Sequence, residues 1–245
     1  MFDYIAPADL LNDRVILVTG AGQGIGAAAA IAFAEHGADV ILLGRTSTHL
    51  DKVARRIEAM GRTRPMVEVM DLEHAAADDY SSLMQGIERR HGRLDGVLHN
   101  ASILGPRTRV ENTPVAAFAQ VMTVNVNATY ALARATLPLL QRSSKASVVF
   151  TSSSVGRKGR AEWGSYAISK FATEGLMQVL ADEYPTTEIR FNSVNPGGTR
   201  TAMRAEAYPS EDPATRPTPD SIMPVYLYLM GRDSAHISGR ALDAQ

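Results

Sequence analysis

The chain has 245 residues, of which 45% are hydrophobic and 21% charged, and its formal net charge is -1. This composition is typical of one globular domain and gives no reason to expect a nucleic acid or an anionic membrane as partner. Because the chain contains no cysteine, disulfides, cysteine nucleophiles and thiolate metal sites are excluded.

The first residues, MFDYIAPADLLNDR, carry acids and lack a basic, apolar leader. No apolar run approaches the roughly 20 residues that cross a bilayer. The six histidines show no metal-ligand spacing. We therefore expect a soluble, cytoplasmic protein without a metal and without a membrane partner.

Short β-branched runs alternate with longer helical patterns in the first hundred residues. The expected strands and helices are, in chain order, a strand at 14–19, a helix from about Gly24, a strand at 39–44, a helix from about Thr48, a strand at 65–70, a helix from about Ala77 and a strand at 94–100. Such alternation builds βαβ units, in which parallel strands form a sheet with helices on both faces.

The second half of the chain continues this pattern. We expect, in order, a helix at about 115–140, a strand at 146–154, a helix containing 165–175, a strand at 187–196, a helix near 220–230 and a strand at 237–243. Right-handed crossovers would wind these elements into one Rossmann-like, doubly wound parallel sheet of about seven strands. The chain would form a single α/β domain over 1–245. Residues 197–220, rich in proline and charge, are expected to form a substrate lid or simply a long surface connection.

A glycine cluster, TGAGQGIG at 19–26, stands between the first strand and the first helix. Glycines let the chain turn tightly and let backbone N–H groups approach a pyrophosphate at the positive end of the helix. The spacing differs from GxGxxG, and glycine clusters also occur in turns that bind nothing. The position of the cluster nevertheless favours a dinucleotide site.

The end of the second strand bears on the choice of cofactor. Sites for NAD usually carry an acid there, which holds the ribose 2'-hydroxyl. Here Gly44 and Arg45 occupy that position, and a guanidinium can bind a 2'-phosphate. Arg45 could also be an ordinary solvated loop arginine. Together with the missing acid, it favours NADP(H), with NAD(H) as the alternative.

A predicted helix carries Tyr166 and Lys170 four residues apart, so their side chains leave on the same side. A free phenol has a pKa of about 10, which must fall by roughly 3 units for acid–base work near neutral pH. At an effective dielectric near 20, the electrostatic attraction between a phenolate and a lysine cation about 4 Å away is large enough for a shift of that order. We therefore expect Lys170 to lower the pKa of Tyr166, and Ile168, Phe171 and Ala172 to be packing residues.

Together these segments resemble the short-chain dehydrogenases and reductases over essentially the whole chain. The motifs that carry the resemblance are TGAGQGIG, Asp71 with Leu72, Asn100 with Ala101, Asn125, Ser153, YAISK at 166–170 and NPGGTRT at 195–201. Each motif is loose alone, whereas their order and spacing are highly specific. YIAP, SSSVGRKGR, FATEGLMQVLADEY and ALDAQ are most similar to one bacterial group of oxidoreductases in this family, whose substrate is unassigned.

The resemblance implies hydride transfer between a nicotinamide cofactor and a carbonyl or secondary alcohol. Tyr166 would be the general acid in reduction and the general base in oxidation. Lys170 would also hold the nicotinamide ribose, and Ser153 would polarise the substrate oxygen. Asn125 would join a water-linked proton relay with Lys170. Family spacing, rather than chemistry, selects Ser153 from three adjacent serines.

The same resemblance implies the cofactor-binding residues and the assembly. The cofactor-binding set is Gly20, Gln23, Gly24, Ile25, Gly26, Arg45, Asp71, Leu72, Asn100, Tyr166, Lys170, Pro196, Gly197, Thr199 and Thr201. Asp71 and Leu72 would bind the adenine, and Thr199 or Thr201 the nicotinamide end. Ordinary turn and strand-end hydrogen bonding is the alternative for these residues. A homodimer or homotetramer is also implied.

Two positions depart from the family pattern or suggest another chemistry. The family usually reads NNAG where this chain reads HNAS, so Ser102 replaces a glycine and is expected to narrow the approach to the cofactor or to require a backbone adjustment. His99 is interpreted as a packed residue rather than a catalytic one.

A basic cluster of Arg157, Lys158 and Arg160 would border the substrate pocket in relatives. It could favour an acidic substrate, although a solvated loop is the commoner explanation. A further alternative for the whole chain is a catalytically weak nucleotide-binding regulatory or scaffold protein on the same fold. The intact Asn125, Ser153, Tyr166 and Lys170 argue against that alternative.

Overall fold

The computed structural model describes residues 1–184 and 189–245. In this part of the chain, seven parallel strands form one sheet in the order β3-β2-β1-β4-β5-β6-β7. The strands are β1 (Val15–Thr19), β2 (Asp39–Gly44), β3 (Met66–Val69), β4 (Gly96–His99), β5 (Ser147–Thr151), β6 (Arg190–Asn195) and β7 (Ala241–Asp243). The α-helices are α1 (Gly24–Glu35), α2 (Ser47–Ala59), α3 (Ala77–His91), α4 (Val115–Met122), α5 (Ala128–Leu140), α6 (Gly164–Glu183), α7 (Ala202–Ala207) and α8 (Met223–Met230).

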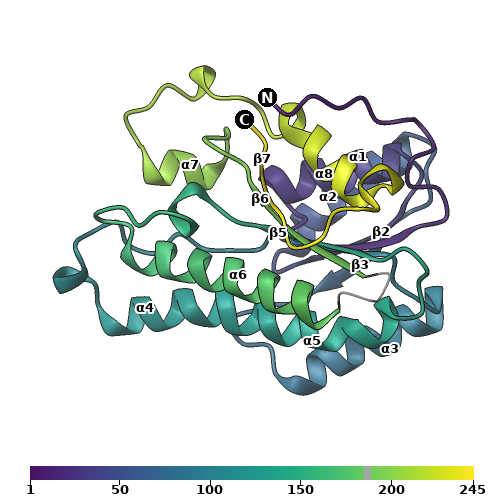
Figure 1. Cartoon of the computed structure of the whole chain (residues 1–245), viewed down its shortest axis with the longest axis horizontal. Coiled ribbons are helices and arrows are strands. Elements are labelled where there is room, and N and C mark those ends of the chain that lie inside the picture. Colours follow the sequence, from purple (N-terminus) through teal and green to yellow (C-terminus); the bar gives the residue numbers. More distant parts are fainter. Residues whose placement is uncertain (185–188) are drawn as a thin grey trace.

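Helices cover both faces of the sheet. Figure 1 shows α1, α2 and α8 on one side and α3, α4, α5 and α6 on the other. The strand order reverses between β1 and β4, which opens a crevice at the carboxyl ends of the strands. The expected Rossmann-like, doubly wound sheet in a single domain is confirmed.

The apolar strands explain why the sheet is buried on both sides. In β1, Val15 and Leu17 pack in the cluster that includes α3, α5 and α6. The alternate residues Ile16 and Val18 pack with α1, α2 and α8. Because successive side chains point to opposite faces, a strand covered by helices on both sides is apolar throughout.

Most elements lie within a few residues of their expected positions. The expected helix at 115–140 is continuous, but a π-helical turn at Thr123–Asn127 separates α4 from α5. Within the expected strand at 187–196, residues 187 and 188 lie outside the described residues. The irregular stretch 197–220 contains the short helix α7, which its sequence pattern did not predict.

The outer face of α6 corrects one expectation. Ile168 and Phe171 expose 46% and 48% of their surface, and Val179 exposes 53%. The expectation that Ile168 and Phe171 are packing residues is therefore wrong, and Ala172 is only partly buried. The face of α6 that meets the sheet instead carries polar side chains, among them Lys170. In the described residues, no helix is long and apolar enough to span a membrane.

Candidate active site

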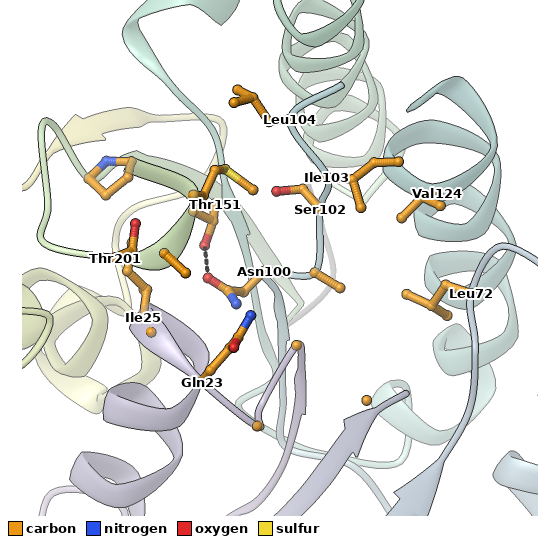
Figure 2. Close-up of a pocket in the computed structure, with 18 of the residues that line it drawn as sticks. Gln23, Ile25, Leu72, Asn100, Ser102, Ile103, Leu104, Val124, Thr151 and Thr201 are labelled. Carbon is orange, nitrogen blue, oxygen red and sulfur yellow. Dashed lines mark hydrogen bonds between the residues drawn. The ribbon is translucent and has the colours of Figure 1, made fainter. Parts of the chain in front are cut away.

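One pocket opens at the carboxyl ends of the strands and collects most of the expected site residues (Figure 2). The expected residues that line it are Gly20, Gln23, Gly24, Ile25, Arg45, Asp71, Leu72, Asn100, Ser153, Tyr166, Pro196, Gly197, Thr199 and Thr201. The other three, Gly26, Asn125 and Lys170, do not line it but lie behind its wall. The pocket therefore joins the glycine turn to Ser153 and Tyr166.

Two glycines of the turn need a backbone conformation that favours glycine, and a third lacks room for a Cβ. Gly20 and Gly24 have φ angles of +64° and +55°, a region that favours glycine. A Cβ on Gly26 would overlap the carbonyl oxygen of Gly20 and lie 2.7 Å from Nδ2 of Asn100. The first turn of α1 carries no acidic residue. Its N–H groups are thus suited to an anion.

Thr19 fixes the loop after β4 against this turn. Its Oγ1 accepts hydrogen bonds from the backbone N–H groups of Asn100 (2.9 Å) and Ala101 (3.0 Å). Oγ1 of Thr151 donates to Oδ1 of Asn100 at 3.3 Å, shown as a dashed line in Figure 2. Thr19 stands inside the glycine motif, but glycine spacing carries no signal for this role.

Asn125 connects the same loop to α6. Its Oδ1 accepts from the N–H of Ile103, and its Nδ2 donates to the Ile103 carbonyl, both at 2.9 Å. Nδ2 also donates to Oγ of Ser169 at 3.0 Å. The π-helical turn, a feature often found at functional sites, places this amide inward. A water-linked relay with Lys170 stays a prediction.

Tyr166 and Lys170 are both buried, with 9% and 3% exposure. Nζ of Lys170 donates to the Thr151 carbonyl at 2.8 Å and lies 5.5 Å from the Tyr166 ring centroid. Burial lowers the pKa of Lys170 to about 8, against the charge of Glu174, which raises it. Burial also raises the pKa of Tyr166 to about 12, while a hydrogen bond with Ser102 lowers it. The shift is opposite to the depression expected from Lys170.

The three adjacent serines differ in their positions. Ser152 and Ser153 line the pocket, whereas Ser154 is exposed outside it. Oγ of Ser153 accepts from the Val155 N–H at 3.4 Å. Oγ of Ser152 is buried without a hydrogen-bond partner among the described residues. Ser152 and Ser153 thus both share the pocket wall with Tyr166, and Ser153 also begins the next turn.

The backbone at Ser102 is not strained. Among the described residues other than glycine, positive φ angles occur only at Asp13 and Glu162. Ser102 therefore does not adopt the left-handed conformation that favours glycine. Its side chain lines the pocket.

None of the three residues of the basic cluster lines the pocket. Arg157 donates from Nε to Oε1 of Glu174 (3.2 Å), from Nη1 to Oδ1 of Asp243 (2.9 Å) and from Nη2 to the Leu242 carbonyl (3.0 Å). The described pocket lining includes neither Arg157 nor Lys158. The alternative of an acidic substrate therefore gains no support from this cluster.

His99 is a packed residue. Its ring stacks on Phe150 with a centroid distance of 4.8 Å and an interplanar angle of 7°. Complete burial lowers its pKa to about 3, so the ring is neutral at physiological pH.

Aromatic rings and arginines cluster beside the part of the pocket that Trp163 and Arg204 line. The Arg107 guanidinium lies 4.7 Å from the ring centroids of both Trp163 and Tyr208, and Arg204 lies 3.8 Å from that of Tyr208. Arg204 also donates two hydrogen bonds to Glu211, at 2.6 and 2.7 Å. The Arg107 contacts join distant parts of the chain, and the Arg204 contacts lie in the stretch 197–220, which has no periodic pattern. Neither set of contacts had a signal in the sequence.

Comparison with known proteins gives consistent matches. The family model for short chain dehydrogenases matches residues 14–212. The oxidoreductase YciK of Escherichia coli K12 is 53% identical over 242 residues, which cover 99% of this chain and 96% of YciK. The family resemblance and its bacterial group, expected from the motifs, are confirmed.

Solved structures extend this likeness to the whole fold. A short chain dehydrogenase from Pseudomonas syringae is 61% identical, with a TM-score of 0.99 and complete coverage of both chains (100%). A short chain dehydrogenase from Shigella flexneri, complexed with NADP, is 54% identical with a TM-score of 0.95. That match covers 98% of this chain and 100% of the other.

Proposed function

This chain belongs to the short-chain dehydrogenase and reductase family of oxidoreductases, and from that premise we propose that it transfers hydride between NADP(H) and a carbonyl or secondary alcohol. Tyr166 is the proposed general acid and base. The observation that carries the proposal is that one pocket joins the glycine turn to Ser153 and Tyr166. Lys170 lies directly behind the tyrosine ring.

The pocket residues fit a phosphorylated dinucleotide. The glycine turn offers backbone N–H groups to a pyrophosphate, and Asp71 and Leu72 line the pocket where an adenine would lie. Arg45 is exposed and has no hydrogen bond or ion pair within residues 1–184 and 189–245. Its guanidinium is therefore available for the 2'-phosphate. The NADP complex of the Shigella relative supports the same choice.

When bound, NADP(H) supplies or accepts the hydride. In reduction, Tyr166 donates its proton to the substrate oxygen, while Ser153 donates a hydrogen bond to that oxygen and polarises the carbonyl. Burial raises the pKa of Tyr166 to about 12, so the phenol carries its proton at neutral pH and is ready to act as an acid. Lys170 stabilises the negative charge that remains on the tyrosine.

The proposal also includes a lid over the pocket and a subunit interface on α6. Met203, Arg204 and Ala207 of α7 line the pocket, which supports a lid function for 197–220. The exposed Phe171 and its apolar neighbours on α6 support assembly into a homodimer or homotetramer. The cytoplasmic location and the absence of a metal stay predictions.

The test is NADPH oxidation with a panel of aldehydes, ketones and quinones. For any accepted substrate, Tyr166→Phe is expected to lower kcat/KM by about 10²–10⁴-fold, because it removes the acid. NADPH affinity, measured separately by fluorescence, should change far less. If the variant kept most of the activity, the acid would be wrongly assigned. Tight NADPH binding with no turnover across the panel would favour the scaffold alternative.

A further inference from the structure

Three separate segments form an apolar wall of the pocket beside Tyr166. The loop after β4 contributes Leu104, which is labelled in Figure 2, the residue before α6 contributes Trp163, and α7 contributes Met203 and Ala207. The same side chains pack with Tyr166 in one hydrophobic cluster. The shape of this wall therefore depends on how the three segments are held together.

Arg107 joins the loop after β4 to both of the other segments. Its guanidinium lies over the rings of Trp163 and Tyr208, 4.7 Å from each centroid, and Nη1 donates a hydrogen bond to the carbonyl of Ala207. Nη2 lies 3.9 Å from Oε2 of Glu162. A planar guanidinium can stack on rings and donate hydrogen bonds in its own plane at the same time. One side chain thus bridges the three segments of the wall.

The contacts of Trp163 extend this bridge to the proposed acid. The ring centroids of Trp163 and Tyr208 are 6.0 Å apart, and those of Trp163 and Tyr166 are 5.9 Å apart. The backbone of Trp163 forms an isolated parallel bridge with Thr108, the residue after Arg107. The side chain is 8% exposed, and its Nε1 has no hydrogen-bond partner among the described residues. Ring contacts, rather than hydrogen bonds of the indole, therefore set the position of the Trp163 side chain.

Arg107 acts from outside the pocket. The described pocket lining includes neither Arg107 nor Tyr208. On the α7 side, Arg160 donates to the hydroxyl of Tyr208 at 3.0 Å, and the Arg204 guanidinium lies 3.8 Å from the Tyr208 ring centroid. Arg204 lines the pocket, but its charge is balanced by two hydrogen bonds to Glu211. The wall therefore suits an uncharged, apolar group of a substrate.

We propose that Arg107 is a positioning residue for the hydride transfer proposed above, which holds Trp163 and α7 together as the wall that binds an apolar group of the substrate. Arg107 acts through Trp163, because that ring contacts both the guanidinium and the Tyr166 ring. The reacting groups are held by other elements, Tyr166 by α6 and Ser153 by the end of β5. Loss of Arg107 should therefore weaken substrate binding more than it slows the chemical step.

The test compares Arg107→Met with the wild-type protein in the reduction of benzaldehyde and acetaldehyde by NADPH. Methionine keeps an apolar stem but lacks the planar cation, so the KM for benzaldehyde should rise about ten-fold with kcat within about two-fold. Acetaldehyde has little apolar surface for the wall, and its kcat/KM should change by less than about two-fold. Arg107→Lys, which keeps only the charge, should resemble Arg107→Met. The exposed Arg109→Met on the same loop is the control.

Tyr208 provides a matched pair of variants for the ring contact. Tyr208→Leu removes the ring and should reproduce the effect of Arg107→Met, whereas Tyr208→Phe keeps the ring and should restore the KM for benzaldehyde. Equal KM values for these two variants would overturn the inference, because stacking would then not hold the wall. A loss in Arg107→Met that falls equally on both aldehydes, or mainly on kcat, would also overturn it.

Two readouts that need no turnover separate this inference from the proposed function. Trp163 is the single tryptophan of the chain, so its fluorescence in the NADP⁺ complex reports on the wall directly. In Arg107→Met, acrylamide should quench this fluorescence more strongly, and the amides of α7 should exchange with deuterium about ten-fold faster. Unchanged quenching and exchange would overturn the inference. Both changes, in a protein whose wild type reduces no carbonyl, would support the held wall and count against hydride transfer.

Discussion

The two ends of the pocket are built from different atoms. At the glycine turn, the glycines carry no side chain, and a Cβ on Gly20, Gly22 or Gly26 would lie 3.0 Å or less from a neighbouring atom. At the proposed catalytic end, the side chains of Ser153 and Tyr166 form the surface, with the buried Lys170 beside the Tyr166 ring. Substitutions that add atoms should therefore impair binding at the glycine turn, whereas substitutions that remove side-chain atoms should impair the catalytic end. The same reasoning gives the order of the expected effects.

Gly26→Ala is expected to have the largest effect at the backbone end. The added Cβ would overlap the Gly20 carbonyl oxygen, so the turn must open. We expect NADPH binding to weaken by at least about 100-fold, equivalent to about 2.7 kcal/mol and within the usual cost of overpacking. Isothermal titration calorimetry measures the affinity. Gly159→Ala is the matched control, because nothing lies within 4 Å of a Cβ there. Equal affinities of the two variants would contradict a backbone-built site.

Substitution of Arg45 tests whether a side chain beside the glycine turn contributes to cofactor binding. Arg45→Gln removes the proposed partner of the 2'-phosphate and is expected to weaken NADPH binding by about 10–100-fold, since hydrogen bonds to charged groups contribute roughly 1.5–3 kcal/mol. NADH, which lacks that phosphate, should bind as before. Exposed Arg55 on α2 provides the control Arg55→Gln. Wild-type protein that bound NADH as tightly as NADPH would disprove the preference itself.

Substitution of Glu174 tests how its negative charge affects the pKa of Lys170. Burial lowers the pKa of Lys170 from 10.5 to about 8, and the Glu174 charge opposes that shift. The unfolded chain thus binds more protons than the folded protein between about pH 8 and 10.5, so the stability rises with pH through this window. Glu174→Gln should lower the pKa of Lys170 further and extend the window to lower pH.

Thermal unfolding across this pH range, together with the alkaline limb of the reduction rate, measures the effect of Glu174. Glu183→Gln, an exposed change on the same helix, is the control. If both variants had the wild-type pH dependence, the charge of Glu174 would not act on Lys170. If Lys170→Met kept the rise in stability between pH 8 and 10.5, another group would be responsible for it.

The sequence predicted the backbone end better than the surroundings of the catalytic end. Continuous apolar runs such as residues 15–18 of β1 identify strands covered on both faces, and glycine spacing identifies the turn that follows them. Both signals are local. The π-helical turn at Asn125 depends instead on hydrogen bonds to Ile103 and Ser169, which come from distant parts of the chain.

The faces of α6 show a second limit of the sequence pattern. Apolar periodicity assigns Phe171 to the core, but the buried face carries Lys170 and Glu174. Glu174 is accommodated by Arg157 and by Ser193, whose Oγ donates to it at 2.7 Å. Burial of charged groups depends on such tertiary partners, and hydrophobic periodicity cannot detect them. The contacts of Glu211 with Arg204 and Arg216 escaped prediction for another reason, because the stretch 197–220 that contains all three residues has no periodic pattern.

Gly175→Ala is a glycine-to-alanine substitution like Gly26→Ala, but at a position where glycine is not required. It has the smallest expected effect. Gly175 is exposed within α6, and nothing lies within 4 Å of a Cβ there. Alanine should therefore raise the free energy of unfolding by about 0.5–1 kcal/mol, because it restricts the unfolded chain. Denaturant titration measures this gain, and NADPH affinity should stay unchanged.

The concentration dependence of that gain then tests the proposed assembly. Gly175 lies on the same helix as the exposed Ile168, Phe171 and Val179, so a second copy packed closely on this face would meet the added methyl group. In that case the gain should shrink as protein concentration rises, and sedimentation should show a weaker oligomer. A gain that is constant over a hundred-fold range of concentration, with unchanged sedimentation, would place any subunit contact elsewhere on the molecule.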